Sequence, residues 1–173
     1  MYPSSWTHAL SKGNRTGSIA FATNATLHGG AFSILLDGTF NAGGPYGQGT
    51  NVGQYYKFDL TNSYTIDGFK VFLTGLTTLE TNRIGYFDFE GSADNSTWVS
   101  LTTGFIWGDT TSPNGTNLQA QTSDSDLSET FPSVSIQTKL FTNTVAYRYY
   151  RFMGTSGNWN DNPYYCEICF KVG

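Results

Sequence analysis

The stretch from Tyr86 to Leu101, YFDFEGSADNSTWVSL, constrains the fold more than any other part of this sequence. Phe87 and Phe89 alternate with polar or acidic residues, and a period of two places both phenylalanines on one face of a strand. Residues 91–96, GSADNS, are a dense block of turn residues, after which WVSL resumes a pattern suited to a half-buried strand. The stretch therefore predicts a β-hairpin with one buried face and one solvated face.

The composition favours an all-β domain around this hairpin. Charged residues make up 13% of the 173 residues and aromatic residues 16%, and apolar residues nowhere recur at the period of a long helix. Short antiparallel strands without covering helices need two packed sheets. We therefore expect an antiparallel β-sandwich of about eight to ten strands in one domain over residues 18–173. Residues 1–17 are expected to form an N-terminal arm or edge strand, anchored by Trp6.

The charge distribution argues against two classes of partner. The net charge is −4, and the Lys and Arg residues are scattered, whereas nucleic-acid binding relies on clustered basic residues. No apolar run approaches the ~20 residues that span a membrane. The first 17 residues also lack the apolar core of a signal peptide. We therefore expect neither a nucleic-acid partner nor membrane insertion.

Two cysteines, Cys166 and Cys169, lie in the segment YYCEICFKV, whose alternation predicts a strand. A redox C-x-x-C motif belongs at a helix start, and residues three apart on a strand face opposite ways, so we expect two unpaired thiols. A zinc site would need two further ligands nearby, and buried thiols without a metal are the favoured interpretation. Free thiols are typical of folding in a reducing compartment.

The order of several sequence pieces resembles discoidin-type domains, as in the coagulation factor V and VIII C-type domains and many bacterial carbohydrate-binding modules. The pieces are ILLDGT at 34–39, YYKFDL at 55–60, IDGFKVFL at 66–73, FEGSADNSTW at 89–98, YRYYRF at 147–152 and YCEICFKVG at 165–173. The resemblance implies a galactose-binding-like sandwich, or jelly roll. The chain departs from the family at 40–50, where a Thr-x-Trp motif is missing, and in the long excursion at 104–130.

The resemblance implies non-catalytic glycan binding, with galactose-type sugars as the first expectation. Sugar recognition uses flat aromatic faces for the C–H side of the ring, and amides, carboxylates or guanidinium groups for its hydroxyls. Loops 40–56 and 154–164 combine these groups, and the loop before the hairpin adds a charged donor. The candidate ligand-binding residues are Tyr46, Arg83, Asn158, Trp159, Asn160, Asp161 and Tyr164, with Trp159 as the sugar platform. The alternative is that these aromatic residues only anchor their loops to the sandwich.

A structural calcium ion is also implied by the resemblance. In the family, the aspartate of a DG turn, nearby backbone carbonyls and a C-terminal glutamate form an oxygen cage, which suits an ion that takes six to eight oxygen ligands. The corresponding groups here are the carboxylates of Asp37 and Glu167 and the carbonyls of Ile34, Thr39, Ala42 and Cys166. Ala42 stands where the family usually offers a threonine hydroxyl. The alternative is a plain Asp-Gly turn and a solvated glutamate.

Two other classes of function stay open. Asp88 and Glu90 stand about 7 Å apart on one strand face, a separation that suits the acid and base of an inverting glycosidase. Alternating acids on a solvated strand face are the simpler explanation. The other class is an attachment domain of a virion, such as a phage tail or fibre, for cell adhesion or host attachment. Glycan binding predicts an extracellular or virion-surface location, cell-surface polysaccharides as partners, and other domains of a larger protein or virion as neighbours.

Overall fold

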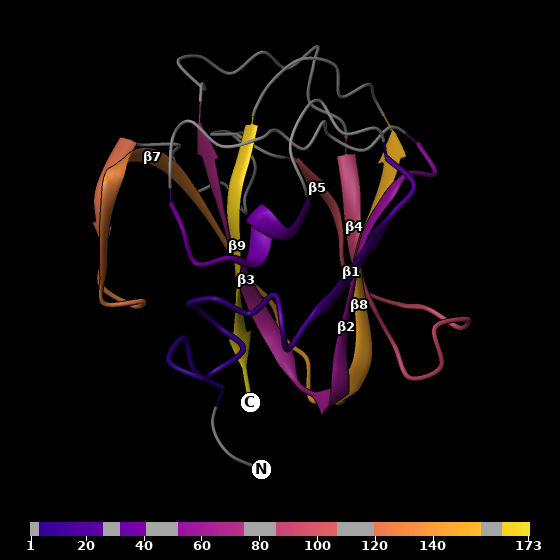
Figure 1. Cartoon of the computed structure of the whole chain (residues 1–173). Helices are drawn as coiled ribbons and strands as arrows, with labels where there is room; N and C mark the ends of the chain where they lie inside the picture. The colour runs from indigo at the N-terminus through magenta and orange to yellow at the C-terminus, as the bar shows by residue number, and fades with distance from the viewer. Residues whose placement is uncertain (1–3, 26–31, 41–51, 75–85, 107–119, 157–163) are drawn as a thin grey trace.

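The structure is a computed structural model that describes residues 4–25, 32–40, 52–74, 86–106, 120–156 and 164–173 (Figure 1). The strands in this part of the chain are β1 (Ala20–Thr23), β2 (Tyr55–Tyr64), β3 (Ile66–Thr74), β4 (Tyr86–Ser92), β5 (Val99–Ile106), β6 (Ala120–Asp124), β7 (Glu129–Leu140), β8 (Tyr147–Ser156) and β9 (Tyr164–Val172). A 3₁₀ helix, η1 (Phe32–Leu36), lies between β1 and β2. No helix in the described segments has the length and apolar character needed to cross a membrane.

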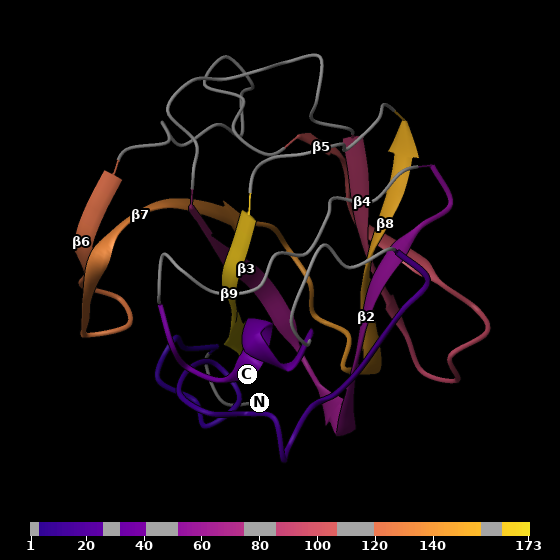
Figure 2. The same ribbon diagram turned by 45° about the horizontal axis from the view of Figure 1, so that its top comes forward.

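The strands form two antiparallel sheets that face each other (Figures 1 and 2). One has five strands in the order β1-β2-β8-β4-β5, and the other has four in the order β6-β7-β3-β9. Strand β8 lies in the centre of the larger sheet because it pairs with both β2 and β4. The expected antiparallel β-sandwich is confirmed, with nine strands in the described segments.

Strands β4 and β5 form the hairpin that the alternating phenylalanines predict. Phe87 and Phe89 are both completely buried. The turn is organised by Asp94, whose carboxylate Oδ1 accepts hydrogen bonds from the backbone N–H groups of Ser96 (2.9 Å) and Thr97 (2.8 Å). These hydrogen bonds to the charged form hold the pKa of Asp94 well below its usual range. The turn residues and the period-two pattern of the strand both predict this hairpin, and the structure confirms it.

Aromatic rings from both sheets meet in the core between them. Phe89 and Phe152 from the larger sheet have ring centroids 4.8 Å apart, and Phe69 from the smaller sheet lies 4.9 Å from Phe152. Edge-to-face and tilted pairs of this kind add to the hydrophobic gain of burial. Leu35 and Leu36 of η1 join the same cluster, so the short helix contributes to the inter-sheet core.

Two elements differ from the sequence-based expectation. Strand β2 continues to Tyr64 through Thr61, Asn62 and Ser63, although such a polar run is typical of a turn that ends a strand. Its pairing with β8 shifts in register after Asp59, and Thr61 adopts a positive φ of 68°, so the strand passes through an irregularity and then resumes. Strand β6 lies inside the excursion at 104–130. The sequence did not predict it, because AQTSD has no alternation of apolar residues.

The N-terminal residues pack on the smaller sheet. Ser5 forms an isolated antiparallel bridge with Val172, which brings the two ends of the chain together (Figure 1). Trp6 is buried, and the Lys70 Nζ lies 4.9 Å from the centroid of its ring, so Trp6 is the anchor that the sequence predicts. The domain boundary at residue 17 stays a prediction.

A second hydrophobic cluster, here called the outer cluster, is built around the smaller sheet. Its members are Trp6, Phe40, Phe72, Leu127, Phe131, Val134, Ile136, Cys166 and Cys169. Pairing between β3 and β9 shifts from Phe72↔Glu167 to Leu73↔Tyr165, which leaves Cys166 at a bulge. The two cysteines consequently share one cluster instead of facing opposite ways as the strand pattern predicted. Both are free and buried. Burial raises the pKa of Cys166 to about 12 and that of Cys169 to about 11, which favours the protonated thiol over the thiolate.

Candidate functional site

The ends of several strands converge at one end of the sandwich, here called the distal end and defined by Gly53, Thr74, Tyr86, Ser156 and Tyr164. Thr74 at the end of β3 pairs with Tyr164 at the start of β9. Tyr86 at the start of β4 pairs with Ser156 at the end of β8. The distal end lies opposite the chain termini in Figure 1.

Backbone hydrogen bonds fasten the segment before β2 to the same end. The Gly53 N–H donates to the Gly154 carbonyl, and the Gly154 N–H donates to the Gln54 carbonyl, both at 2.9 Å. Asn24 fixes this segment from the other side, because its Nδ2 donates to the Gly53 carbonyl (3.0 Å) and its Oδ1 accepts from the Tyr55 N–H (2.8 Å). The residues that follow 41–51 and those on both sides of 75–85 and 157–163 therefore lie at the same end of the sandwich.

These three segments carry the candidate sugar ligands, and they lie outside the residues that the structure describes. Tyr46, Arg83, Asn158, Trp159, Asn160 and Asp161 fall in them, so their roles stay predictions. Tyr164 is placed at the start of β9, at the distal end. The structure shows that described residues next to these segments, although far apart in the sequence, pair with one another at the distal end.

One exposed aromatic residue at the distal end was not among the candidate ligand-binding residues chosen from the sequence. Tyr86, the first residue of β4, is 45% exposed, whereas the next residue, Phe87, is fully buried. Val52, directly before Gly53, is 64% exposed. The signal for Tyr86 was present in the sequence, because strand alternation places it opposite the buried phenylalanines. It provides an accessible ring beside the segment that contains Arg83.

The residues chosen as calcium ligands are arranged differently from an oxygen cage. Glu167 is fully buried, and its carboxylate is already bound on both oxygens: Oε1 forms an ion pair with Arg15, and Oε2 accepts a hydrogen bond from the Gly38 N–H at 3.0 Å. Asp37 uses its Oδ1 to accept from the Thr39 N–H at 2.7 Å, inside the turn.

Among the backbone carbonyls of the expected cage, that of Ile34 has a hydrogen-bond partner within the same turn. The Ile34 carbonyl accepts from the Asp37 N–H at 3.5 Å, Cys166 is buried, and Ala42 lies outside the described residues. Among the residues that are described, no three His, Cys, Asp or Glu side chains gather as they would around a metal ion. A Glu167 carboxylate bound on both oxygens by Arg15 and Gly38 does not fit the role of a calcium ligand.

Asp88 and Glu90, the pair considered for glycoside hydrolysis, lie on the outer face of the larger sheet. Glu90 Oε2 lies 2.5 Å from the Nε of Arg151, whose guanidinium stacks 4.0 Å from the centroid of the Trp98 ring. Asp88 Oδ1 accepts a hydrogen bond from the Gly104 N–H at 2.9 Å. Both carboxylates are therefore already bound by other groups of the protein. The arrangement suits a paired surface charge better than a proton donor.

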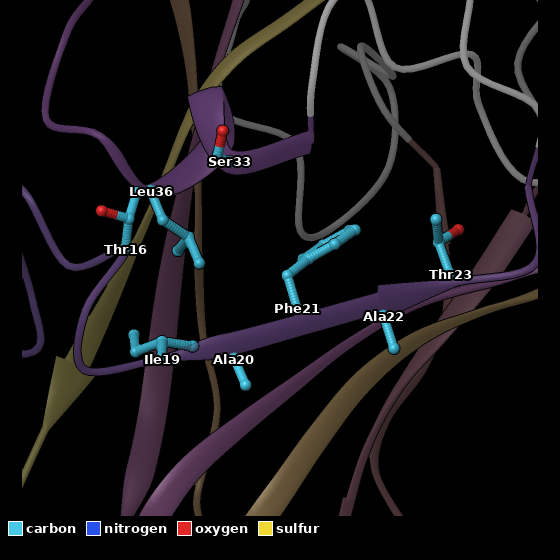
Figure 3. Close-up of a pocket in the computed structure, with 8 residues that line it drawn as sticks. All are labelled: Thr16, Ile19, Ala20, Phe21, Ala22, Thr23, Ser33 and Leu36. Atoms are coloured by element: carbon cyan, nitrogen blue, oxygen red, sulfur yellow. The ribbon is translucent and has the colours of Figure 1, made fainter.

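A pocket of about 520 Å³ opens between β1 and η1 (Figure 3). Its described lining residues are Thr16, Ile19, Ala20, Phe21, Ala22, Thr23, Ser33 and Leu36, none of which is charged. Phe21 and Leu36 point into the space between the strand and the helix, while Ala20 and Ala22 point to the other side of β1. The Thr23 hydroxyl already donates to the Tyr55 carbonyl at 2.6 Å. This lining favours a small apolar group over a sugar.

The sequence matches no family model and no curated protein. Solved structures do match the fold. The lectin domain of lectinolysin, in complex with Lewis B antigen, superposes with a TM-score of 0.57 at 15% identity, over 95% of this chain and 96% of that one. A family 32 carbohydrate-binding module of NanJ from C. perfringens, in complex with galactose, gives a TM-score of 0.54 at 10% identity and covers 92% and 98% of the two chains.

A further carbohydrate-binding module from Clostridium perfringens, in complex with GalNAc-β-1,3-galactose, gives a TM-score of 0.52 at 13% identity, over 90% of this chain and 96% of that one. At these identities the likeness concerns the fold and not the function. The chain has the discoidin-like, galactose-binding-like β-sandwich fold of these domains, as the sequence resemblance implied.

Proposed function

We propose that this chain is a non-catalytic glycan-binding module whose ligand surface lies at the distal end. The observation that carries the proposal is that the residues following 41–51 and those on both sides of 75–85 and 157–163 lie at this one end of the sandwich. Each segment contributes candidate ligand residues, and binding residues are often found on loops that a rigid scaffold carries. Domains of the same fold hold sugars in their solved complexes, which supports this class of ligand.

Galactose-type sugars are the proposed ligands. Galactose and GalNAc-β-1,3-galactose are bound by two of the domains that share the fold. An aromatic ring stacks on the apolar C–H side of such a sugar, and neighbouring amides and carboxylates bind its hydroxyls. Trp159, with Asn158, Asn160 and Asp161 around it, offers this combination, and the exposed ring of Tyr86 adds a second apolar surface at the same end.

The direct experiment is a glycan array with the full chain, followed by calorimetric titration with the sugars that bind. We expect saturable binding of galactose-containing glycans. An array without any bound glycan would argue against the proposal. Binding only to glycans without galactose or GalNAc would retain glycan binding and remove the assignment to galactose-type sugars.

Two variants test the position of the binding surface. Trp159→Ala and Tyr86→Ala should each weaken binding about tenfold or more, equivalent to ~1.4 kcal/mol, because they remove stacking surface. Neither should lower the melting temperature greatly. Leu140→Ala is the matched control, because Leu140 is 59% exposed and pairs with Gly68 near the start of β3, at the opposite end. A Trp159→Ala variant that loses ~3–5 kcal/mol of stability and still binds normally would identify Trp159 as a structural cap.

The non-catalytic part of the proposal has a separate test. The ion pair of Glu90 with Arg151 supports a structural role for this acid. We expect the chain to leave oligosaccharides intact in a long incubation. Hydrolysis by the wild-type chain that disappears in Glu90→Gln would contradict the proposal and favour a glycosidase.

A further inference from the structure

Arg15 is a fully buried arginine between the N-terminal segment and β9. Its Nη2 forms the ion pair with Oε1 of Glu167. Its guanidinium also donates to four backbone carbonyls: Ile168 (2.7 Å), Gly13 (3.1 Å), Leu10 (3.4 Å) and Ser11 (3.4 Å). A planar group with five N–H donors matches such a set of convergent oxygens, whereas a lysine ammonium has only three donors.

The backbone closes tightly around this pair. The Arg15 N–H donates to the Leu36 carbonyl at 2.7 Å, which joins the end of η1 to the N-terminal segment. Gly38, whose N–H binds Glu167, has a φ of +78° and packs so closely on Gly13 that a Cβ there would lie 2.6 Å from the Gly13 carbonyl carbon. Glu167 therefore receives the guanidinium on one oxygen and a backbone N–H on the other.

We propose that the guanidinium of Arg15 takes the place that the family resemblance assigns to a structural calcium ion. Carboxylate and carbonyl oxygens are the ligands that calcium takes, and here such oxygens converge on N–H donors instead. A divalent cation next to the buried guanidinium would be repelled by it. The turn at Asp37 is joined to β9 by the Gly38 N–H, which binds the same carboxylate as the guanidinium, and the fold of this chain does not depend on calcium.

The first test measures thermal melting of the full chain with excess calcium chloride and with a chelator. We expect the same melting temperature in both. A ligand that binds only the folded state must raise its stability, so a calcium-dependent rise of several degrees would overturn the proposal. Calorimetric titration with calcium chloride should show no binding heat at this site, and saturable binding with one ion per chain would also overturn it.

The second test compares two arginines. Arg15→Met should lower the melting temperature by about 10 °C, because it leaves a buried carboxylate without its partner. Arg148→Met is the matched control, since Arg148 pairs with Asp59 in the same chain but its side chain is 43% exposed. We expect the control to melt like the wild type. Equal effects of the two substitutions would overturn the proposal.

Two further variants keep the test decisive if Arg15→Met does not fold. Arg15→Lys retains the charge but has fewer N–H donors, so it should fold with a melting temperature below that of the wild type. A melting temperature equal to that of the wild type would contradict the role of the guanidinium. Arg15→Ala removes the internal cation and leaves the oxygens, so its melting temperature should rise with calcium when that of the wild type does not. A variant that folds but is unaffected by calcium would show that these oxygens do not form a cation position.

Discussion

The outer faces of the two sheets use similar charged residues in opposite ways. On the larger sheet, Arg148 pairs with Asp59 through two hydrogen bonds of 2.8 and 2.9 Å, and both side chains remain partly exposed at 43% and 25%. On the smaller sheet, the Arg15–Glu167 pair is completely covered by the N-terminal segment and the residues after η1. Both pairs join an arginine to a carboxylate, but the Arg15–Glu167 pair is shielded from water and also binds backbone groups.

The difference in solvent exposure indicates how much the loss of one partner of each ion pair should destabilise the folded state. An exposed pair exchanges water for a partner at little net gain, so its loss is tolerated. A buried pair contributes little compared with a well-packed apolar pair, but once the site is built around it, removing one partner leaves an uncompensated charge. We therefore expect the same type of substitution to have large effects beneath the N-terminal segment and small effects on the wet face.

The largest effect is expected for Glu167→Gln. It should cost about 3–5 kcal/mol of unfolding free energy, because the charge of Arg15 stays buried without its carboxylate. Urea unfolding of the variant and of the double variant Arg15→Met/Glu167→Gln measures this. The double variant should lose less than the sum of the single losses, and strictly additive losses would show that the two groups are not coupled.

A smaller loss of stability is expected when either of two glycines with positive φ is replaced by alanine, and the loss should differ between the two positions. Gly38→Ala should cost about 3 kcal/mol, since the φ of +78° is unfavourable for alanine and the new Cβ meets the Gly13 backbone. Gly104→Ala, in β5 of the larger sheet, should cost only ~1–2 kcal/mol, because its φ is +60° but no heavy atom of the described residues lies within 4 Å of the position that a Cβ would take. Equal losses in urea unfolding would contradict the close packing of Gly38 on Gly13.

Lys70 is the next residue on the covered face. Its Nζ donates to Asp124 (2.6 Å) and Asp126 (2.7 Å), and its side chain is 4% exposed. Lys70→Met should cost about 2 kcal/mol, because two charge-assisted hydrogen bonds are lost and Asp124 stays nearly buried. Lys57→Met is the control on the wet face, where Lys57 donates to Asn95 at 2.9 Å. Chemical denaturation of both variants should show a clear loss only for Lys70→Met.

The smallest effect concerns Asp59 and depends on pH. The hydrogen bond from Arg148 is the main cause that lowers the pKa of Asp59 in the folded state. A depressed carboxyl pKa contributes stability above the unfolded value of about 3.9, and this contribution is lost as the pH falls through the lower folded value. Asp59→Asn should therefore melt slightly below wild type at pH 7, and the difference should vanish in acid. A difference that grows as the pH falls would contradict this sign.

Local patterns in the sequence were sufficient to predict the sandwich and the positions of most of its strands along the chain. The alternation around Phe87 and Phe89, with the turn block at 91–96, predicted the hairpin because strand period and turn chemistry depend on near neighbours. The aromatic segment at 147–152, one of the pieces that resemble the family, forms the central strand β8. Strand β6 was missed because no apolar period marks it.

Only the tertiary structure decided how Glu167 is used. The sequence offered a glutamate in the right piece of the chain for a metal ligand, but its partner Arg15 lies 152 positions away, inside a segment expected to be a peripheral arm. No local period connects such residues, because their contact depends on how the N-terminal segment and β9 come together. In the same way, the meeting of Gly53 with Gly154 and of Tyr86 with Ser156 follows from strand pairing, which sequence spacing does not determine.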